Sequence, residues 1–167
     1  MLPNINPYLR PKGISENKWC DLKISEMEET ILSVGADQIG CFIAEPILAS
    51  GGVIVPPAGY HQRSLELCKK YDIIYISDET VTGFGRLGHW FASKEVFNIQ
   101  PDIITCAKGL TSGYLPMGAA IISDSLIDGI KNTEGSQPFT NGYTYSCHPV
   151  AAKAALTNIN IISNENI

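Results

Sequence analysis

The sequence has few positive charges, and they are scattered along the chain. Its 17 aspartates and glutamates outnumber its 12 lysines and arginines, which gives a formal net charge of −5. The densest basic stretch is the pair Lys69 and Lys70. Proteins that bind nucleic acids neutralise phosphates with clustered lysines and arginines. We therefore expect no nucleic-acid partner.

Patterns of metal-binding and disulfide-forming residues are missing too. The five cysteines are an odd number and form no CxxC pair, and the three histidines have no ligand spacing with one another or with a cysteine. We expect no metal site. Cysteines scattered among apolar residues in this way are typical of small buried side chains in a reducing compartment.

Long apolar segments are absent as well. No run approaches the roughly 20 apolar residues that a membrane-spanning helix needs. The first residues, MLPNINPYLRPKG, lack the apolar core of a signal peptide. These two absences predict a cytoplasmic protein without a membrane partner.

The residues that are present have the composition of a globular protein. With 44% hydrophobic and 17% charged residues over a length of 167, one domain can bury a substantial core. The start of the chain is rich in proline and asparagine. We expect an irregular lead-in over residues 1–22 and part of a folded domain over residues 23–167.

Strand-like and helix-like segments alternate along the chain. Short apolar runs predict strands at 39–44, 73–77, 102–107 and 117–123. Amphipathic segments predict helices at 25–35, 60–72, 93–99, 124–131 and 149–163, the first beginning at a capping box of Ser25 and Glu28. Because several strands are apolar on both faces, the pattern indicates an α/β fold with a mainly parallel sheet flanked by helices.

Three of the predicted strands end in ionisable residues, namely Glu45, Asp78 and Lys108. In a parallel sheet these ends share one edge, and ligands of open α/β proteins bind there. Lys108 lies between an apolar strand and a loop of small residues, in PDIITCAKGLTSGYLPMGAA. Two interpretations stay open at this point. Either Asp78 and Lys108 form a structural ion pair or face water separately, or they share a site.

The shared site has a specific chemistry. A partly desolvated lysine loses proton affinity and becomes a nucleophile toward aldehydes. A carboxylate at the neighbouring strand end can hold a pyridine nitrogen in its protonated form. Lys108 and Asp78 together therefore suit pyridoxal phosphate, with the lysine as the Schiff-base residue. Gly109, which has no side chain, would let the backbone approach this cofactor.

Five blocks of the sequence, in their order and spacing, resemble the class III aminotransferases. They are FIAEPI, SGGVIVPPAGY, YDIIYISDETVTGFGRLGHWF, PDIITCAKGLTSGYLPMGAAI and GYTYSCHPVAAKAAL. The resemblance runs from about Cys41 through the last predicted helix and is closest to the omega-amino-acid or diamine:pyruvate branch. It implies the large domain of pyridoxal-phosphate fold type I, with Lys108 as the Schiff-base lysine and Asp78 as the partner of the pyridine nitrogen.

The resemblance implies a function and further site residues. The enzyme would be a transaminase that moves an amino group from an amine or omega-amino acid donor to a keto acid such as pyruvate. Thr144 would reach the cofactor phosphate in the other subunit of a homodimer, and the Tyr143 backbone would bind the same phosphate. Glu45 would stand near the wall of the active site. Thr80 replaces the valine or isoleucine that packs on the cofactor ring, and Cys147 replaces a frequent glycine.

Simpler roles compete for several of these residues. Thr144 is also placed to cap the helix that starts near Pro149. Glu45 is equally suited to bind loop amides at a strand end. Arg86 fits a clamp on the glycine-rich loop better than a substrate ligand. Tyr114 either lines a substrate pocket or packs in the interior.

The sequence also lacks parts that the family has. Class III enzymes are more than twice as long, and an upstream phosphate-binding Gly-Ser loop, a ring-stacking aromatic and a C-terminal small domain are all missing. We therefore expect an internal piece of the large domain. A non-catalytic truncated fragment, and an aminomutase or decarboxylase of the same fold, remain alternatives, although DETVTGFGR fits transaminases better than an aminomutase.

Overall fold

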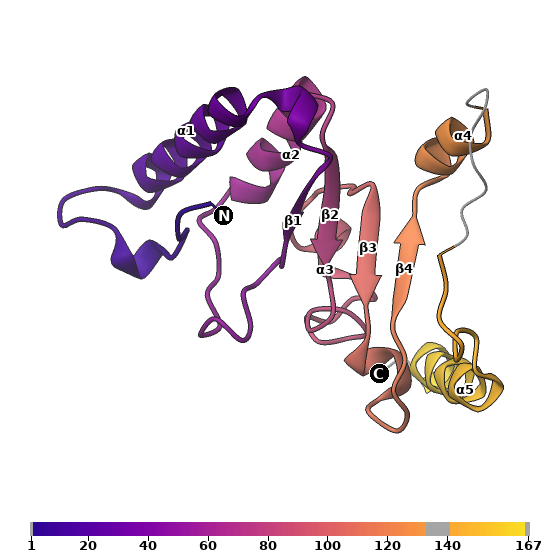
Figure 1. The fold of residues 1–167 in the computed structure, drawn as a ribbon. Helices are drawn as coiled ribbons and strands as arrows, with labels where there is room; N and C mark the ends of the chain where they lie inside the picture. Colours follow the sequence, from indigo (N-terminus) through magenta and orange to yellow (C-terminus); the bar gives the residue numbers. More distant parts are fainter. Residues whose placement is uncertain (1, 133–140, 166–167) are drawn as a thin grey trace.

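A four-stranded sheet forms the centre of the computed structural model, which describes residues 2–132 and 141–165. The strand order is β1-β2-β3-β4, and the strands are β1 (Cys41–Ala44), β2 (Ile74–Asp78), β3 (Ile103–Cys106) and β4 (Ala119–Ile122). The first three are parallel, and β4 runs antiparallel to β3 (Figure 1). The mainly parallel sheet expected from the apolar runs is thus confirmed.

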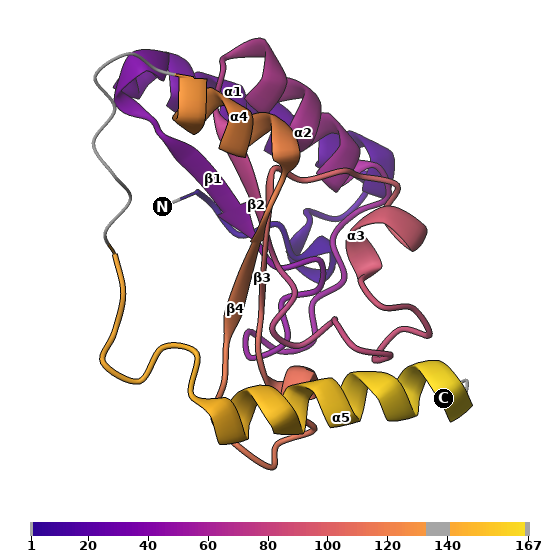
Figure 2. The same cartoon turned by 90° about the vertical axis from the view of Figure 1, so that its right-hand side faces the viewer.

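Helices flank the sheet, as the sequence predicts. They are α1 (Glu16–Val34), α2 (Tyr60–Lys70), α3 (Ala92–Glu95), α4 (Asp124–Asn132) and α5 (Pro149–Glu165), with short 3-10 turns η1 (Pro7–Leu9), η2 (Ala36–Gln38) and η3 (Lys108–Thr111). α1 and α2 pack side by side, whereas α5 lies beyond the end of the sheet to which β2 and β3 point (Figures 1 and 2).

The start of α1 differs from the prediction. The helix begins at Glu16, so the irregular lead-in ends well before residue 22, and Ser25 lies inside the helix instead of capping it. The cap is Ser15, whose hydroxyl oxygen accepts a hydrogen bond from the backbone N–H of Lys18 at 3.2 Å. The residue at the third helical position is a lysine. A lysine cannot accept the hydrogen bond that a glutamate or glutamine at this position would accept from the N-cap N–H. The capping-box sequence is therefore absent at the actual start of α1.

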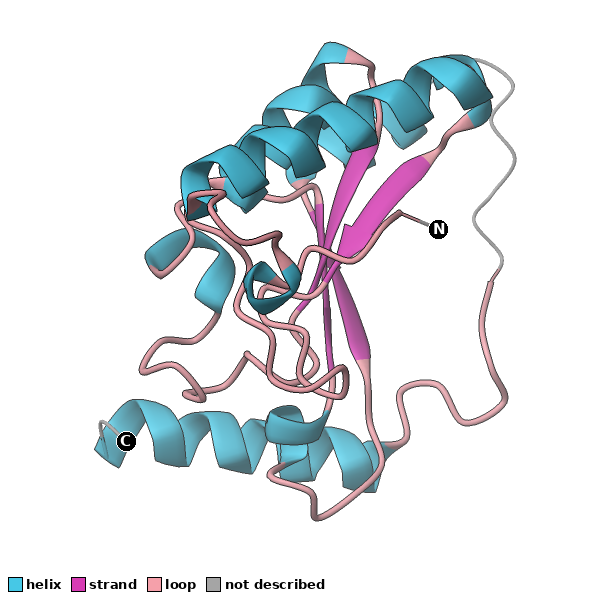
Figure 3. Ribbon diagram, turned by 90° about the vertical axis from the view of Figure 1, so that its left-hand side faces the viewer, coloured by secondary structure: helices cyan, strands magenta, loops and turns pink. Residues whose placement is uncertain are grey.

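The hydrophobic core lies between helices α1 and α2 and one face of the sheet (Figure 3). α1 contributes residues at helical spacing, and they are Cys20, Ile24, Met27 and Ile31. α2 contributes Leu65, Leu67 and Cys68, and the sheet contributes the fully buried Tyr75 with Phe42 beside it. Burial of these apolar side chains is the main force that fixes the sheet against the helices.

The opposite face of the sheet is open by comparison. The register aligns Ile43, Ile76 and Ile103 across three strands on this face, and none of them is fully buried. Asp78 follows on the same face, because side chains two residues apart in a strand point to the same side. The segment 2–5 lies beside β1, where its apolar residues also pack against the core, and it lines a cavity of about 700 Å³ that Asp78 also lines.

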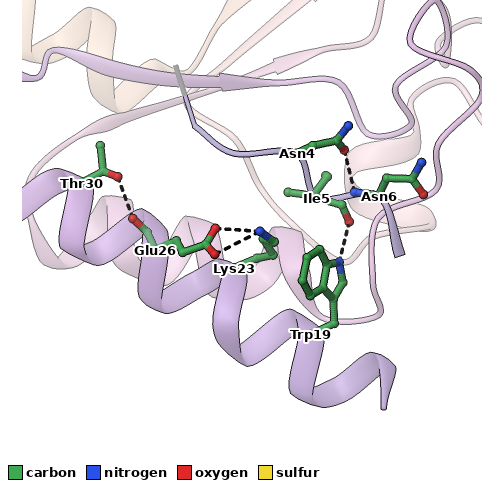
Figure 4. A network of polar contacts seen from close by, with 7 residues as sticks. All are labelled: Asn4, Ile5, Asn6, Trp19, Lys23, Glu26 and Thr30. Carbon is green, nitrogen blue, oxygen red and sulfur yellow. Dashed lines mark hydrogen bonds and ion pairs between the residues drawn. The ribbon is translucent and has the colours of Figure 1, made fainter. Parts of the chain in front are cut away.

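A polar network holds the N-terminal segment in that place (Figure 4). The indole N–H of Trp19 donates to the carbonyl oxygen of Ile5 at 3.2 Å. The Lys23 ammonium is almost completely buried, lies 4.1 Å from the centre of the Trp19 ring and binds both carboxylate oxygens of Glu26, at 3.1 and 2.8 Å. α1 thereby fixes the residues that wall one side of the cavity next to Asp78.

Candidate active site

The topology brings Asp78 and Lys108 to one edge of the sheet. Asp78 is the last residue of β2, and Lys108 follows the end of β3 by two residues. The register pairs Asp78 with Thr105, three positions before the lysine. Both side chains therefore stand where parallel strands end, as the sequence predicts, and this is the edge at which α/β proteins bind ligands.

Asp78 has one carboxylate oxygen in use and one to spare. Its Oδ1 accepts the backbone N–H of Thr80 at 3.0 Å. Its Oδ2 has no hydrogen-bond or ion-pair partner among residues 2–132 and 141–165. The side chain is half-buried beside the open cavity. Oδ2 can accept a hydrogen bond from a protonated ring nitrogen there, while Oδ1 keeps its bond to the Thr80 N–H.

Lys108 is exposed and has an unusual backbone. Its φ angle is 35°, in the left-handed region that residues with a side chain rarely occupy. Such strain costs on the order of 1–3 kcal/mol and concentrates at functional sites. Across the described parts of the chain, the ammonium makes no hydrogen bond or ion pair, and Asp78 is not its partner. The structural ion pair that the sequence left open is thus not formed.

Gly109 shows why the residue after the lysine is a glycine. A Cβ atom placed there would lie 2.9 Å from the Cβ of Phe84 and 3.4 Å from the carbonyl oxygen of Gly83. The backbone that carries Lys108 therefore packs directly on the loop that follows β2. Packing against this loop requires the missing side chain, and access for a cofactor at Gly109 stays a prediction.

Glu79 is the polar residue of this region that sequence reasoning did not single out. It is completely buried, and its carboxylate accepts four hydrogen bonds. The donors are the Thr82 hydroxyl at 2.6 Å, the Ala92 N–H at 3.0 Å, and the Ser93 N–H and hydroxyl at 2.7 and 2.5 Å. The strand alternation was the available signal, since it places Glu79 on the covered face of the sheet while Asp78 faces the open side.

Glu45 and Thr80 lie close to Asp78. Glu45 lines the same cavity, and its Oε2 accepts the backbone N–H of Ala49 at 3.0 Å. Binding to a loop amide is the simpler role considered for Glu45. The Thr80 side chain is half-buried, and its backbone N–H fixes the Asp78 carboxylate. Contacts of either residue with a cofactor stay predictions.

Tyr143 and Thr144 lie on the exposed segment that leads into α5. The backbone N–H of Tyr143 donates to the hydroxyl oxygen of Ser146 at 3.0 Å. Cys147 follows with a φ angle of 58°, a conformation that suits the glycine frequent in class III aminotransferases. Their proposed contacts with a phosphate group remain predictions.

The residues present fit pyridoxal phosphate. Among the described residues, an amine without a hydrogen-bond or ion-pair partner stands just after the end of β3. A carboxylate with one unbonded oxygen stands at the end of the neighbouring strand β2, beside the cavity. A lysine that can form a Schiff base and a carboxylate for the pyridinium nitrogen are the two groups that this cofactor requires. In the parts of the chain that the structure describes, no three His, Cys, Asp or Glu residues are placed to hold a metal ion. None of the described helices is both long and apolar enough to cross a bilayer.

Comparison with known proteins defines the family. The sequence profile of the family "Aminotransferase class-III" matches residues 2–167. The chain is 49% identical over 163 residues to the putrescine–pyruvate aminotransferase of Pseudomonas aeruginosa. The aligned region covers 96% of this chain and 35% of that protein. The chain belongs to the class III aminotransferases, a family of enzymes that use pyridoxal phosphate.

Solved structures agree with this assignment. An omega-transaminase from Thermomicrobium roseum superposes with a TM-score of 0.90 at 39% identity, covering 98% of this chain and 36% of that one. An amine transaminase from an uncultivated Pseudomonas species, in its form with bound pyridoxal phosphate, superposes with a TM-score of 0.92 at 41% identity, covering 99% and 37%. The chain thus spans about a third of the length of the relatives that it matches.

Proposed function

We propose that this chain is the cofactor-binding core of a transaminase. The enzyme would move an amino group from an amine or omega-amino acid donor to a keto acid such as pyruvate. The observation that carries the proposal is the position of Lys108, which has no partner among the described residues and a strained backbone, at the same sheet edge as the unbonded carboxylate oxygen of Asp78. The putrescine–pyruvate and omega-transaminase relatives support the choice of substrates.

Each residue has a separate task in this proposal. Pyridoxal phosphate supplies the electron sink on which amino-group transfer depends. Lys108 would hold the cofactor covalently through its side-chain amine and would carry a proton to and from the substrate carbon. Asp78 would hold the proton on the ring nitrogen. Thr80 would pack beside the ring, and Glu45 would limit the site on the β1 side.

A homodimer is part of the same proposal. Thr144 and the Tyr143 backbone would bind the cofactor phosphate of the partner subunit. Three tyrosines near this segment are unusually exposed for aromatic residues, namely Tyr114 at 85%, Tyr143 at 82% and Tyr145 at 80%. Exposed aromatic surface of this kind is typical of a contact area. Residues 23–167 would form part of the large domain, and we place the enzyme in the cytoplasm.

The test has two hosts, the 167-residue chain and a chimera in which the chain replaces the matched third of the Pseudomonas aeruginosa relative. Each is incubated with pyridoxal phosphate, reduced with borohydride and mapped by peptide mass spectrometry. We expect the adduct on Lys108, its loss in Lys108→Ala and its retention in Lys69→Ala, which removes an exposed lysine from α2. The chimera should transfer amino groups from putrescine to pyruvate.

Comparing the chain alone with the chimera separates a transaminase core from a non-catalytic fragment. An adduct in the chimera but not in the chain alone still supports the proposal, because the other segments complete the site. Asp78→Asn keeps an oxygen for the Thr80 N–H, so we expect the adduct to persist while the transfer rate falls at least about 100-fold. A folded chimera without an adduct, or with one on another lysine, overturns the proposal and favours the non-catalytic fragment.

A further inference from the structure

Glu79 carries a buried negative charge that the described cations do not neutralise. Its side chain is completely buried, and none of the ion pairs among residues 2–132 and 141–165 includes it. Four hydrogen bonds compensate the charge instead. Oε1 accepts from the N–H and the hydroxyl of Ser93, and Oε2 accepts from the Ala92 N–H and the Thr82 hydroxyl. A buried carboxylate is tolerated only when its oxygens are bonded in this way.

These bonds close the glycine-rich loop between β2 and α3 at both ends. Thr82 lies near the start of the loop, and Ala92 and Ser93 begin α3 at its end. The Glu79 carbonyl oxygen also accepts the backbone N–H of Gly83 at 3.0 Å. Glu79 therefore fixes both ends of this loop, whose tip is closed by backbone bonds of its own, such as that from the Phe84 N–H to the Trp90 carbonyl oxygen at 2.8 Å.

The same residue connects to both halves of the proposed site. On one side, Glu79 follows Asp78 directly in the chain, and its own N–H donates to the Thr105 carbonyl oxygen at 2.8 Å, which ties the end of β2 to β3. On the other side, the closed loop presents Gly83 and Phe84 to the backbone of Gly109, the residue after Lys108. A shift of this loop would move the lysine relative to the aspartate.

We propose that Glu79 is a positioning residue, which holds Asp78 and Lys108 in the relative placement that pyridoxal phosphate requires. It acts through the β2–α3 loop and touches neither the cofactor nor the substrate. The inference rests on the proposed function, because it concerns the same site.

Glu79→Gln is the informative change, because each carboxylate oxygen faces one backbone N–H. Oε1 faces that of Ser93 and Oε2 that of Ala92. Whichever way the glutamine amide turns, its NH₂ group opposes a backbone donor that cannot rotate away. The side chain keeps its size, but one end of the loop must open. The matched control is Glu95→Gln, which neutralises an exposed carboxylate on α3.

The experiment introduces both variants into the 167-residue chain and into the chimera, and compares each with its unmodified host. It measures the fraction of cofactor trapped on Lys108 by borohydride, the pH midpoint of the visible absorption of the bound cofactor, and the circular dichroism of the chain without cofactor. We expect Glu79→Gln to trap cofactor about 10- to 100-fold more weakly and to shift the pH midpoint, with unchanged helix content. Glu95→Gln should match the wild-type chain in all three.

The outcomes are distinguishable. If a wild-type host traps cofactor on Lys108 and Glu79→Gln in that host traps it equally, with the same pH midpoint, Glu79 only stabilises the fold and the inference is overturned. If neither the wild-type chain nor the wild-type chimera traps cofactor on Lys108, the proposed function fails and the inference falls with it. If Glu79→Gln does not fold, Thr82→Val takes its place, because it removes just one of the four bonds. A shifted pH midpoint in Thr82→Val then supports the inference, and an unchanged midpoint overturns it.

Discussion

The side-chain amide of Asn158 donates to the carbonyl oxygens of Gly109 and Leu110, at 2.8 and 3.2 Å. These bonds join α5 to the turn that begins at Lys108, across about 50 residues of sequence. Since α5 also packs against η3, the helix braces the backbone of the candidate lysine.

Replacing Asn158 should loosen this brace. We expect Asn158→Ala to lower the free energy of unfolding by about 1–2 kcal/mol, because two carbonyl oxygens lose their donor. Asn158→Asp should cost more, since a carboxylate would face those oxygens. Urea unfolding followed by circular dichroism measures both. Asn160→Ala, an exposed change on the same helix, should alter the value by less than about 0.5 kcal/mol, and equal effects at the two positions would contradict the brace.

Adding one methyl group at residue 109 should also destabilise the chain. In Gly109→Ala the new Cβ would sit 2.9 Å from that of Phe84, so the turn or the loop must move. Overpacking of this kind costs about 1–3 kcal/mol. Gly40→Ala is the control, since a Cβ there meets no atom within 4 Å. Thermal unfolding of both variants is the measurement, and an unchanged midpoint in Gly109→Ala would mean that the close packing is not real.

His61 should make stability depend on pH. Its Nδ1 lies 2.9 Å from the Tyr75 hydroxyl and its Nε2 lies 3.0 Å from the Pro46 carbonyl oxygen. Burial lowers the pKa of His61, and this outweighs the opposite effects of the Pro46 carbonyl and of Glu79. The unfolded chain, with a histidine pKa of about 6.5, therefore takes up the proton first as the pH falls. The stability that neutral, buried His61 contributes to the fold is therefore fully present above pH 6.5 and is lost as the pH falls below it.

The expected slope can be measured directly. Between pH 6.5 and 5, the free energy of unfolding should decrease by up to about 1.4 kcal/mol per pH unit on account of His61. Urea unfolding at several pH values in wild type and in His61→Gln isolates the effect, because the variant should lose this part of the slope. His89→Gln, which changes an exposed histidine, should keep it. Identical slopes in all three proteins would disprove the assignment.

The thiols should divide into two classes by reactivity. Cys41 and Cys147 are exposed, whereas Cys20, Cys68 and Cys106 are buried. Burial raises the pKa of all three buried thiols, and that of Cys68 to about 12. At pH 8 a disulfide reagent such as DTNB should modify two thiols rapidly and the other three only after unfolding. Cys41→Ser and Cys147→Ser should each lower the number of rapidly modified thiols by one. Rapid modification of more than two thiols in the wild-type chain would contradict the described burial.

Local patterns sufficed for most of the fold. The short apolar runs that end at Glu45, Asp78 and Lys108 predict the three parallel strands, because sequence neighbours alone decide where such a strand stops. The start of α1 was missed because Ser15 caps the helix without a reciprocal partner. Local signals of this kind are weak when only half of the pattern is present.

The site was predictable in part. Asp78 and Lys108 follow from strand ends, since topology alone brings them to one edge. The role of Glu79 was out of reach, because its partners Ala92 and Ser93 lie 13 and 14 residues further along the chain. Strand alternation places Glu79 on the covered face of the sheet, but it does not identify the groups that bond the carboxylate. Only the folded chain shows which donors meet it.

The φ angle of 35° at Lys108 has a consequence for protein engineering. Glycine occupies this conformation without strain, so Lys108→Gly should raise the thermal unfolding temperature even though it removes the proposed reactive amine. A library screened for heat resistance alone would then enrich a change that removes the proposed Schiff-base lysine. Directed evolution of this chain toward robustness should therefore hold position 108 fixed.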